Sequence, residues 1–357
     1  MKILFLIPYP IAEAPSQRFR FEQYFRILDK NGLSFDYQNF LQASDWRLFY
    51  QKGKTVRKLF TLLTGFLKRF LILFQLGKYE IIFIHREITP IGPPIFEWII
   101  SKILKKKIVY DFDDAIWMTD KKNEPIILKT LKWRGKVKSI CRWSYKISCG
   151  NEFLCSYARQ FNKNVYYNPT TVDTEKVHDP SLHEIKGGDR IVIGWTGSHS
   201  TLKYLTELEP VLQSLELKYQ QLQVNVISDL PPNLSLKRLH FSPWSVATEV
   251  SDLARFHIGI MPLPNDEWAK GKCGFKALQY MALQIPTVAS PVGVNTQIIH
   301  HGEDGFLCST ASEWENCISI LIEDKTLRDT IGLAGRKNVI AHYSISSNSS
   351  NFLSLFS

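Results

Sequence analysis

Short apolar runs that alternate with helical stretches constrain this chain more than any other feature. Each run has the length and composition of a buried strand, and the intervening stretches have helical periodicity, for example 18–32, which ends at Gly32. Alternation of strand and helix predicts α/β domains with mostly parallel sheets and helices on both faces. The runs are 2–8, 79–85, 107–112, 145–150, 190–197, 222–228, 256–263 and 285–290.

Two doubly wound domains are expected, because 357 residues exceed one ordinary core. A polar stretch, typical of a linker, separates the first four runs from the last four. In such sheets ligands bind beyond the carboxyl ends of the strands, which predicts a site in the cleft between the domains. The C-terminal segment could pack back on the first domain or fray. We predict an N-terminal domain of 1–170, a linker of 171–189, a second domain of 190–340 and a C-terminal segment of 341–357.

Positive charge is concentrated in the first half of the chain. Residues 1–167 contain 29 Lys and Arg against 14 Asp and Glu, whereas the remainder contains 15 against 20. This imbalance indicates an anionic partner for the first half: a membrane, a nucleic acid or a phosphorylated substrate. No motif of a DNA- or RNA-binding protein accompanies it.

Three basic segments of the first half, 52–74, 101–108 and 129–143, mix Lys and Arg with apolar residues. An amphipathic basic helix of this kind is typical of an anionic membrane interface, and the alternative is a core-facing helix with a solvated basic face. The most apolar stretch, 59–76, is interrupted by Lys68 and Arg69, which argues against a membrane span.

The N-terminus and the cysteines favour the cytoplasm. The first apolar run, Ile3–Ile7, ends at Pro8 and is too short for the core of a signal peptide. The six cysteines lack the spacing of a zinc site and suit buried thiols in a reducing compartment.

The stretch "GKCGFKALQYMALQIPTVASPVGV" (271–294) places Lys272 and Lys276 at the start of a predicted helix. Cations are unfavourable there, because the helix dipole already makes that end positive. An anion such as phosphate, bound by backbone N–H groups, would account for both lysines. The alternative is a pair of solvated surface lysines.

A second candidate anion site is "GWTGSHST" (194–201), which follows a predicted strand and precedes a helix. Gly197 allows a tight turn, and Ser198, Ser200 or Thr201 could cap the helix. The loop could cradle a diphosphate, but Gly and Ser are also common at ordinary joints between strand and helix.

The run from Pro262 to Val294 resembles the nucleotide-sugar-binding segment of family 4 glycosyltransferases. Segments 151–177, 193–205 and 290–307 resemble other parts of these enzymes, so the resemblance extends over nearly the whole chain. It implies the GT-B fold, in which two Rossmann-like, doubly wound domains face each other across a cleft, and a retaining transfer reaction.

The resemblance also implies donor-site residues. Lys272 and Gly274 would line the pocket near the diphosphate, and Gln279 takes the second acidic position of the family's Glu-x7-Glu motif, whose first position falls on Gly271. Trp195 and Ser200 stand where many members have Arg and Lys. The predicted donor-binding residues are Gly197, Ser198, Lys272, Gly274, Phe275, Lys276 and Gln279.

On the acceptor side, Asp113 and Asp114 align with a His-Asp pair of the family and are the candidate catalytic residues. Together with Asp111 they also resemble an Asp-x-Asp metal clamp, and a solvated or capping loop is the third alternative. Four further residues follow predicted strands and could meet the acceptor or phosphates, or form structural ion pairs: Arg18, Arg20, Arg86 and Glu87.

These features predict a retaining hexosyltransferase that moves sugar from a nucleotide-sugar to a saccharide or lipid-linked acceptor. The expected pathway is cell-envelope polysaccharide synthesis, namely lipopolysaccharide, O-antigen, capsule or exopolysaccharide. We expect no metal or other cofactor, no nucleic acid, and a peripheral position on the inner face of the cytoplasmic membrane. The alternatives are a nucleotide-sugar 2-epimerase of the same fold and a basic nucleic-acid-binding protein.

Overall fold

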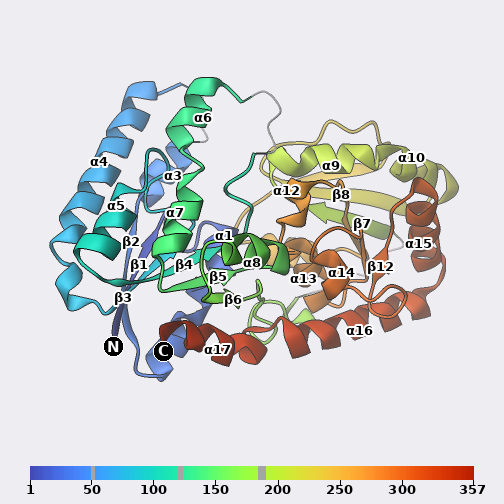
Figure 1. The fold of residues 1–357 in the computed structure, drawn as a ribbon. Helices are drawn as coiled ribbons and strands as arrows, with labels where there is room; N and C mark the ends of the chain where they lie inside the picture. The colour runs from blue at the N-terminus through green and yellow to red at the C-terminus, as the bar shows by residue number, and fades with distance from the viewer. Residues whose placement is uncertain (50–52, 120–123, 184–189) are drawn as a thin grey trace. The chain divides into compact units, whose positions relative to one another are not determined.

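The computed structural model describes residues 1–49, 53–119, 124–183 and 190–357. The chain forms two compact units, Met1–Thr170 with Ser349–Ser357 and Thr171–Asn348 (Figure 1). Residues 171–183 of the predicted linker belong to the second unit, and its residues 184–189 lie outside the described part. No helix of the described residues is long and apolar enough to cross a membrane.

The sheet of the first unit is parallel throughout, with the order β2-β1-β3-β4-β5-β6 in the described chain. Four of its strands confirm predicted apolar runs, whereas β2 and β6 were not predicted, because their residues are only partly buried. The strands are β1 (Lys2–Ile7), β2 (Ser34–Asn39), β3 (Ile81–His85), β4 (Lys107–Phe112), β5 (Lys146–Cys149) and β6 (Val165–Tyr167).

The helices of the first unit connect these strands, and α4 is much the longest of them. They are α1 (Pro15–Arg18), α2 (Phe25–Lys30), α3 (Ala43–Phe49), α4 (Thr55–Leu73), α5 (Ile95–Trp98), α6 (Ile126–Lys132), α7 (Lys136–Trp143) and α8 (Glu152–Arg159), with the short turns η1 (Glu22–Tyr24), η2 (Leu76–Lys78) and η3 (Ile99–Ile103).

The prediction of one helix over 18–32 is wrong, because the segment is divided into the end of α1, the turn η1 and α2. The backbone leaves helical geometry at Phe21, whose φ is −144°. This break lets two consecutive side chains, Arg20 and Phe21, enter the interior. A continuous helix would turn them about 100° apart around its axis.

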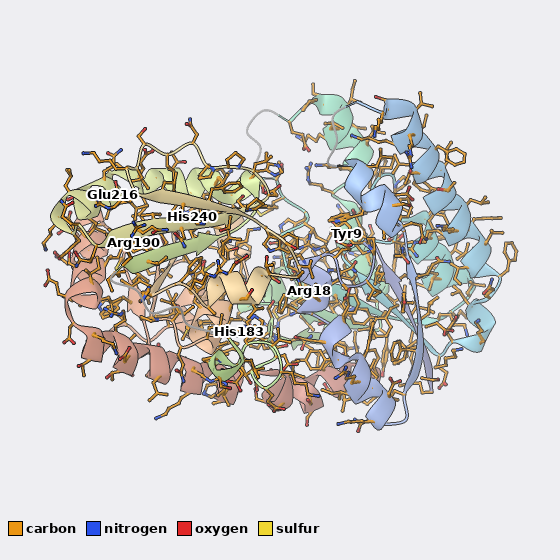
Figure 2. All side chains as sticks on the ribbon, turned by 180° about the vertical axis from the view of Figure 1, so that it is seen from behind. Tyr9, Arg18, His183, Arg190, Glu216 and His240 are labelled. Carbon is orange, nitrogen blue, oxygen red and sulfur yellow. The ribbon has the colours of Figure 1, made fainter. Side chains whose placement is uncertain are left out.

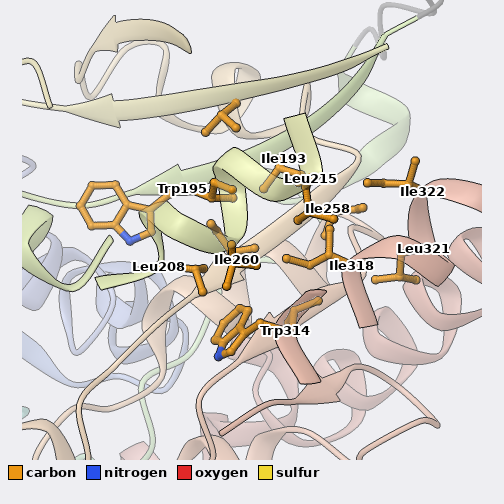
Figure 3. Close-up of a cluster of buried hydrophobic side chains, with 14 of the residues drawn as sticks. Ile193, Trp195, Leu208, Leu215, Ile258, Ile260, Trp314, Ile318, Leu321 and Ile322 are labelled. Carbon is orange, nitrogen blue, oxygen red and sulfur yellow. The ribbon is translucent and has the colours of Figure 1, made fainter. Parts of the chain in front are cut away.

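The second unit also has a parallel sheet, in the order β12-β11-β10-β7-β8-β9. Counted along the unit, this is the strand order 3-2-1-4-5-6 of a dinucleotide-binding fold. Apolar side chains of the strands and of α10 and α15 form its core (Figure 3). The strands are β7 (Ile191–Thr196), β8 (Leu222–Ser228), β9 (Leu239–Pro243), β10 (Ile258–Met261), β11 (Thr287–Ala289) and β12 (Phe306–Leu307).

Helices of the second unit follow its strands, and the last long helix leads toward the C-terminus. They are η4 (Pro180–Leu182), η5 (His199–Thr201), α9 (Leu202–Glu207), α10 (Glu209–Lys218), α11 (Glu249–Leu253), α12 (Glu267–Lys270), α13 (Phe275–Ala282), α14 (Asn295–Ile298), α15 (Ala311–Glu323) and α16 (Lys325–His342).

The C-terminal residues complete the core of the first unit. They form the end of α17 (Ile345–Leu353) and the turn η6 (Ser354–Phe356). The ring of Phe352 stacks on that of Tyr24 at a centroid distance of 4.3 Å. Lys146 Nζ donates to the carbonyl oxygens of Ser354 and Ser357 at 2.7 and 2.8 Å. The segment therefore packs on the first unit and does not fray.

A buried ion pair joins distant parts of the first unit. Arg20 contacts Asp111 on β4 at 2.5 Å, and both side chains are almost fully buried. His85 Nδ1 and Ser148 Oγ add hydrogen bonds to the same carboxylate at 2.8 and 2.6 Å. Burial alone would raise the pKa of Asp111, but the Arg20 charge and the His85 hydrogen bond outweigh it and hold that pKa below its ordinary value. The pair therefore stabilises the folded state whenever Asp111 is ionised.

We expect Asp111→Asn to destabilise the first unit by about 3–5 kcal/mol at pH 7, because it leaves the Arg20 charge buried without a counter-charge. Since the folded-state pKa is lowered, the stabilisation is present above the unfolded pKa of about 4 and is lost as pH falls through the folded value. Urea unfolding at several pH values should show the difference between variant and wild type shrinking below roughly pH 4.

The control is Glu152→Gln, which removes a half-exposed pair with Arg159 and should cost less than about 1 kcal/mol. Equal effects of the two variants would contradict a dominant role for the buried pair.

Candidate active site

The second unit gathers polar side chains at the carboxyl ends of its strands. Its strand order reverses between β7 and β10, and in doubly wound sheets ligands bind in the crevice at such a reversal. The loop 197–201 follows β7 at this edge. Helix α13 contacts the same edge, because Tyr280 Oη accepts a hydrogen bond from the backbone N–H of Thr196 at 3.0 Å. The end of β7 and α13 are thus packed together in the interior of the unit.

Helix α13 begins at a glycine that cannot be replaced without strain. Gly274 is its N-cap residue, with a φ of 68°, and an added Cβ would lie 2.2 Å from Ile298 Cδ1. A glycine cap offers no side-chain acceptor to the first N–H groups of the helix. An external anion can take that place, as at other helix N-termini.

The two predicted lysines flank this helix start. Lys272 Nζ lies 4.8 Å from the ring centroid of Trp268, and Lys276 Nζ lies 5.6 Å from that of Trp195. Both lysines, and Phe275 between them, are half-buried. Cation–π contacts at this distance restrict the orientation of both lysine side chains. One lysine precedes the N-terminus of α13 and the other lies in its first turn.

Gln279 lies deeper in the same helix, and its side chain is only 1% exposed. Its Nε2 is 3.4 Å from Nε2 of His178, and its Oε1 has no hydrogen-bond partner among the described residues. The rest of α13 is also buried on nearly all sides, including Leu278, Met281 and Ala282. The helix is therefore an internal element of the unit with only its first turn near the surface.

The loop after β7 differs in part from its prediction. Gly197 is required by packing, since an added Cβ would lie 2.5 Å from the Trp195 ring and 2.7 Å from Thr201 Oγ1. Ser198 is exposed and shares a hydrogen bond with Ser200 at 2.8 Å. The predicted capping of the following helix by a Ser or Thr side chain is wrong, because Thr201 Oγ1 donates to the Ser198 carbonyl oxygen instead.

His199 and Asp229 form a pair at this edge that the sequence did not reveal. Asp229 directly follows β8, and its carboxylate accepts from both the backbone N–H and Nδ1 of His199, each at 2.5 Å. Burial raises the pKa of Asp229, but the hydrogen bonds from His199 outweigh this and lower it overall. The Nδ1 contact fixes the orientation of a half-exposed imidazole beside the loop. Two features of the sequence could have indicated this pair: a histidine shortly after a glycine turn and an aspartate directly after a predicted strand.

The first unit has its own group of polar side chains, where its strand order reverses between β1 and β3. Arg86 directly follows β3 and has a left-handed φ of 59°, a conformation that costs energy in a non-glycine residue. Its Nε donates to Asp113 at 2.9 Å, and its Nη2 donates to Asp114 at 2.7 Å. All three side chains are between 13% and 20% exposed. One guanidinium therefore holds both candidate catalytic carboxylates near the surface.

Tyr9, which the sequence did not single out, belongs to the same group and follows β1 (Figure 2). Burial raises the pKa of its phenol, while the charge of Arg86 opposes that rise. Glu87 pairs with Lys136 at 2.6 Å. The remaining candidates do not join this group: the charge of Arg20 is paired inside the unit with Asp111, and the guanidinium of Arg18 lies 4.9 Å from the ring of its neighbour Phe19.

No cluster of three or more His, Cys, Asp or Glu side chains suited to a metal occurs in the described residues. One predicted alternative was a metal clamp of Asp111, Asp113 and Asp114, but these three carboxylates have different partners in the structure. Asp111 faces Arg20 and His85 in the interior, whereas the other two carboxylates bind Arg86.

Comparison with known proteins agrees with this geometry. Residues 193–324 match the family model described as Glycosyl transferases group 1. No curated protein matches the chain. Among solved structures, the chain is similar to sucrose-phosphate synthase from Thermosynechococcus elongatus, with a TM-score of 0.68 and 14% identity over 100% of this chain and 98% of that chain.

Two further structures share the fold over the whole length. A glycosyltransferase from Rickettsia africae has a TM-score of 0.71 and 14% identity, over 99% of this chain and 97% of that chain. HepE from Anabaena, solved in complex with UDP-glucose, has a TM-score of 0.64 and 15% identity, over 100% and 99%. Residues 193–324 thus match a group 1 glycosyltransferase domain, and the chain as a whole has the GT-B fold of these solved structures.

Proposed function

We propose that the protein is a retaining glycosyltransferase that transfers a sugar from a nucleotide diphosphate to a saccharide or lipid-linked acceptor in cell-envelope polysaccharide synthesis. The observation that carries this proposal is the start of α13 in the matched domain, where Lys272 precedes the N-cap residue and Lys276 lies in the first turn. Such a group suits a diphosphate, because ammonium groups and helix N-termini both favour phosphate oxygens.

In this proposal the second unit binds the donor. The negative charge that develops on the leaving diphosphate is stabilised by the two lysines and the N-terminus of α13. The imidazolium form of His199, whose Nδ1 donates to Asp229, adds Nε2 as a further donor from the loop after β7. UDP is the first nucleotide to test, because HepE was solved with UDP-glucose.

The acceptor binds at the carboxyl ends of the first unit's strands. Asp113 and Asp114 accept hydrogen bonds from acceptor hydroxyl groups there, and Arg86 orients both carboxylates. The basic character of this unit supports a site of action at an anionic membrane, on the inner face of the cytoplasmic membrane.

The proposed function predicts both ligand binding and a stereochemical outcome. UDP should raise the melting temperature of the protein, since a ligand at 100 times its Kd stabilises by about 2.7 kcal/mol. With a UDP-sugar and an oligosaccharide acceptor, NMR of the product should show the anomeric configuration of the donor. A product with inverted anomeric configuration would contradict the retaining assignment. Release of an epimerised sugar in the absence of acceptor would show that the reaction is epimerisation and not transfer.

Lys272→Ala should weaken UDP binding by roughly tenfold to a hundredfold, because a charge-assisted phosphate contact contributes about 1.5–3 kcal/mol. Isothermal titration calorimetry with UDP measures the change. Lys270→Ala is the matched control, since that lysine pairs with Glu267 at 2.6 Å and is 39% exposed. His199→Ala, measured in the same way, tests the additional donor. Equal, small effects of Lys272→Ala and Lys270→Ala would remove Lys272 from the site.

We also propose that transfer requires no metal ion. Asp113 and Asp114 already share the charge of Arg86, and the proposed stabilisation of the leaving group uses side chains and a helix end. Activity should therefore persist in excess EDTA. Complete loss on chelation, with recovery on addition of Mn²⁺, would assign the carboxylates to a metal site instead.

A further inference from the structure

Helix α4 presents an apolar face to the solvent. Large apolar side chains recur every three or four residues along it, which places them on one side of a helix. Each of them is more than half exposed, and contiguous exposed apolar surface of this kind marks an interaction site. The stripe consists of Val56, Leu59, Phe60, Leu63, Leu67, Phe70, Leu71 and Phe74.

The opposite face of α4 is fixed by polar and small residues. Arg69 is 1% exposed and donates to the backbone carbonyl oxygens of Ile7, Gln38 and Ile88 at 2.6, 2.8 and 3.1 Å. Burial lowers its pKa to about 9. At Gly65, an added Cβ would lie 2.6 Å from the Phe40 ring, so the helix packs closely there. The helix cannot rotate to hide its apolar stripe without breaking these contacts.

This orientation corrects the prediction of a basic face on segment 52–74, whose residue 52 lies outside the described part. Arg69 is not on the surface, and the exposed face is apolar with basic residues near its N-terminal end. Helix α6 repeats the pattern on a smaller scale in the same unit. Its exposed apolar residues, with the residue that follows it, are Ile126, Ile127, Leu128, Leu131 and Trp133.

Charge indicates what covers the α4 stripe. Residues 53–79 contain no Asp or Glu, but they contain Lys54, Arg57, Lys58 and Lys78 in addition to Lys68 and Arg69. A second copy of this chain would bring two such basic helices together, which like-charge repulsion disfavours. A lipid surface with anionic headgroups complements both the charge and the apolar stripe.

We propose that α4 lies flat in the interface of an anionic membrane, with its apolar stripe inserted among the acyl chains. The helix is about 28 Å long, from 1.5 Å of rise for each of its 19 residues. An interfacial helix of this type enters the headgroup and acyl boundary by about 5–10 Å. The inference rests on the proposed function only for its biological purpose, access to a lipid-linked acceptor, and not for the contact itself.

The experiment compares the full-length protein with two triple variants by sedimentation with vesicles. Phe60→Ser with Leu63→Ser and Leu67→Ser removes the middle of the stripe. Leu217→Ser with Leu333→Ser and Ile340→Ser is the matched control, because these residues are exposed apolar residues of the second unit. The vesicles are phosphatidylcholine alone, or phosphatidylcholine with phosphatidylglycerol. Circular dichroism and melting temperature confirm that both variants fold.

We expect wild type and control to bind the anionic vesicles, and the α4 variant to lose about tenfold or more in partition, since each inserted Leu or Phe contributes through its apolar area. Replacing Lys54, Arg57 and Lys58 with Gln should reduce the preference for anionic over neutral vesicles. Wild-type protein that is already bound to anionic vesicles should remain partly bound when NaCl is raised to 1 M. At that concentration the Debye length is about 3 Å and purely electrostatic attachment is lost.

Equal binding of the α4 variant and the control would overturn the proposal. The proposal would also be overturned if wild-type protein did not bind vesicles and instead formed a dimer that is lost in the α4 variant. The stripe would then be covered by a second copy of the chain. UDP binding, measured on the same proteins, separates the two proposals. The α4 variant should still bind UDP. If neither wild type nor any variant binds UDP while wild type still binds vesicles, the proposed transferase site is refuted and the proposed membrane contact is not.

Discussion

In each unit every described strand runs parallel to its neighbours, and this constraint organises the rest of the molecule. Parallel strands have their carboxyl ends at the same edge, so loops far apart in sequence meet there. Arg86 and Asp113 lie 27 residues apart and meet after β3 and β4, and His199 and Asp229 meet after β7 and β8 in the same way. The polar side chains of the candidate sites are therefore gathered where the sheets end.

The strands predicted from sequence are those that the units bury on both faces. The eight apolar runs match β1, β3, β4, β5, β7, β8, β10 and β11. The unpredicted strands lie toward the sheet edges. β2 and β9 are half-exposed and carry polar residues, while β6 and β12 have only three and two residues. An edge strand has fewer buried side chains, so its apolar signal is too weak to separate from a loop.

Side-chain positions were harder to predict than elements. The position of Lys276 indicated the start of α13 correctly, because this residue lies in its first turn. The prediction that Lys272 belongs to the same helix is wrong, because it precedes the N-cap residue Gly274. Long-range partners had no local signal: Arg20 and Asp111 are 91 residues apart. The apolar period of α4 was also visible, but a period defines a face without saying whether it meets protein, lipid or water. The contacts of Arg69 and Gly65 show which face of α4 packs on the first unit, and so which face is exposed.

The first unit is built from two separate stretches of the chain, and this has a consequence for the order in which its core forms during synthesis. Its sheet is encoded before residue 170, yet Phe352 and Phe356 fill its interior against Tyr24, Phe5 and Phe83. Residues 171–348 form the other unit and are translated in between. The first unit therefore still exposes aromatic surface until residues 349–357 have been made. The part of the chain made first is the part whose core is completed last.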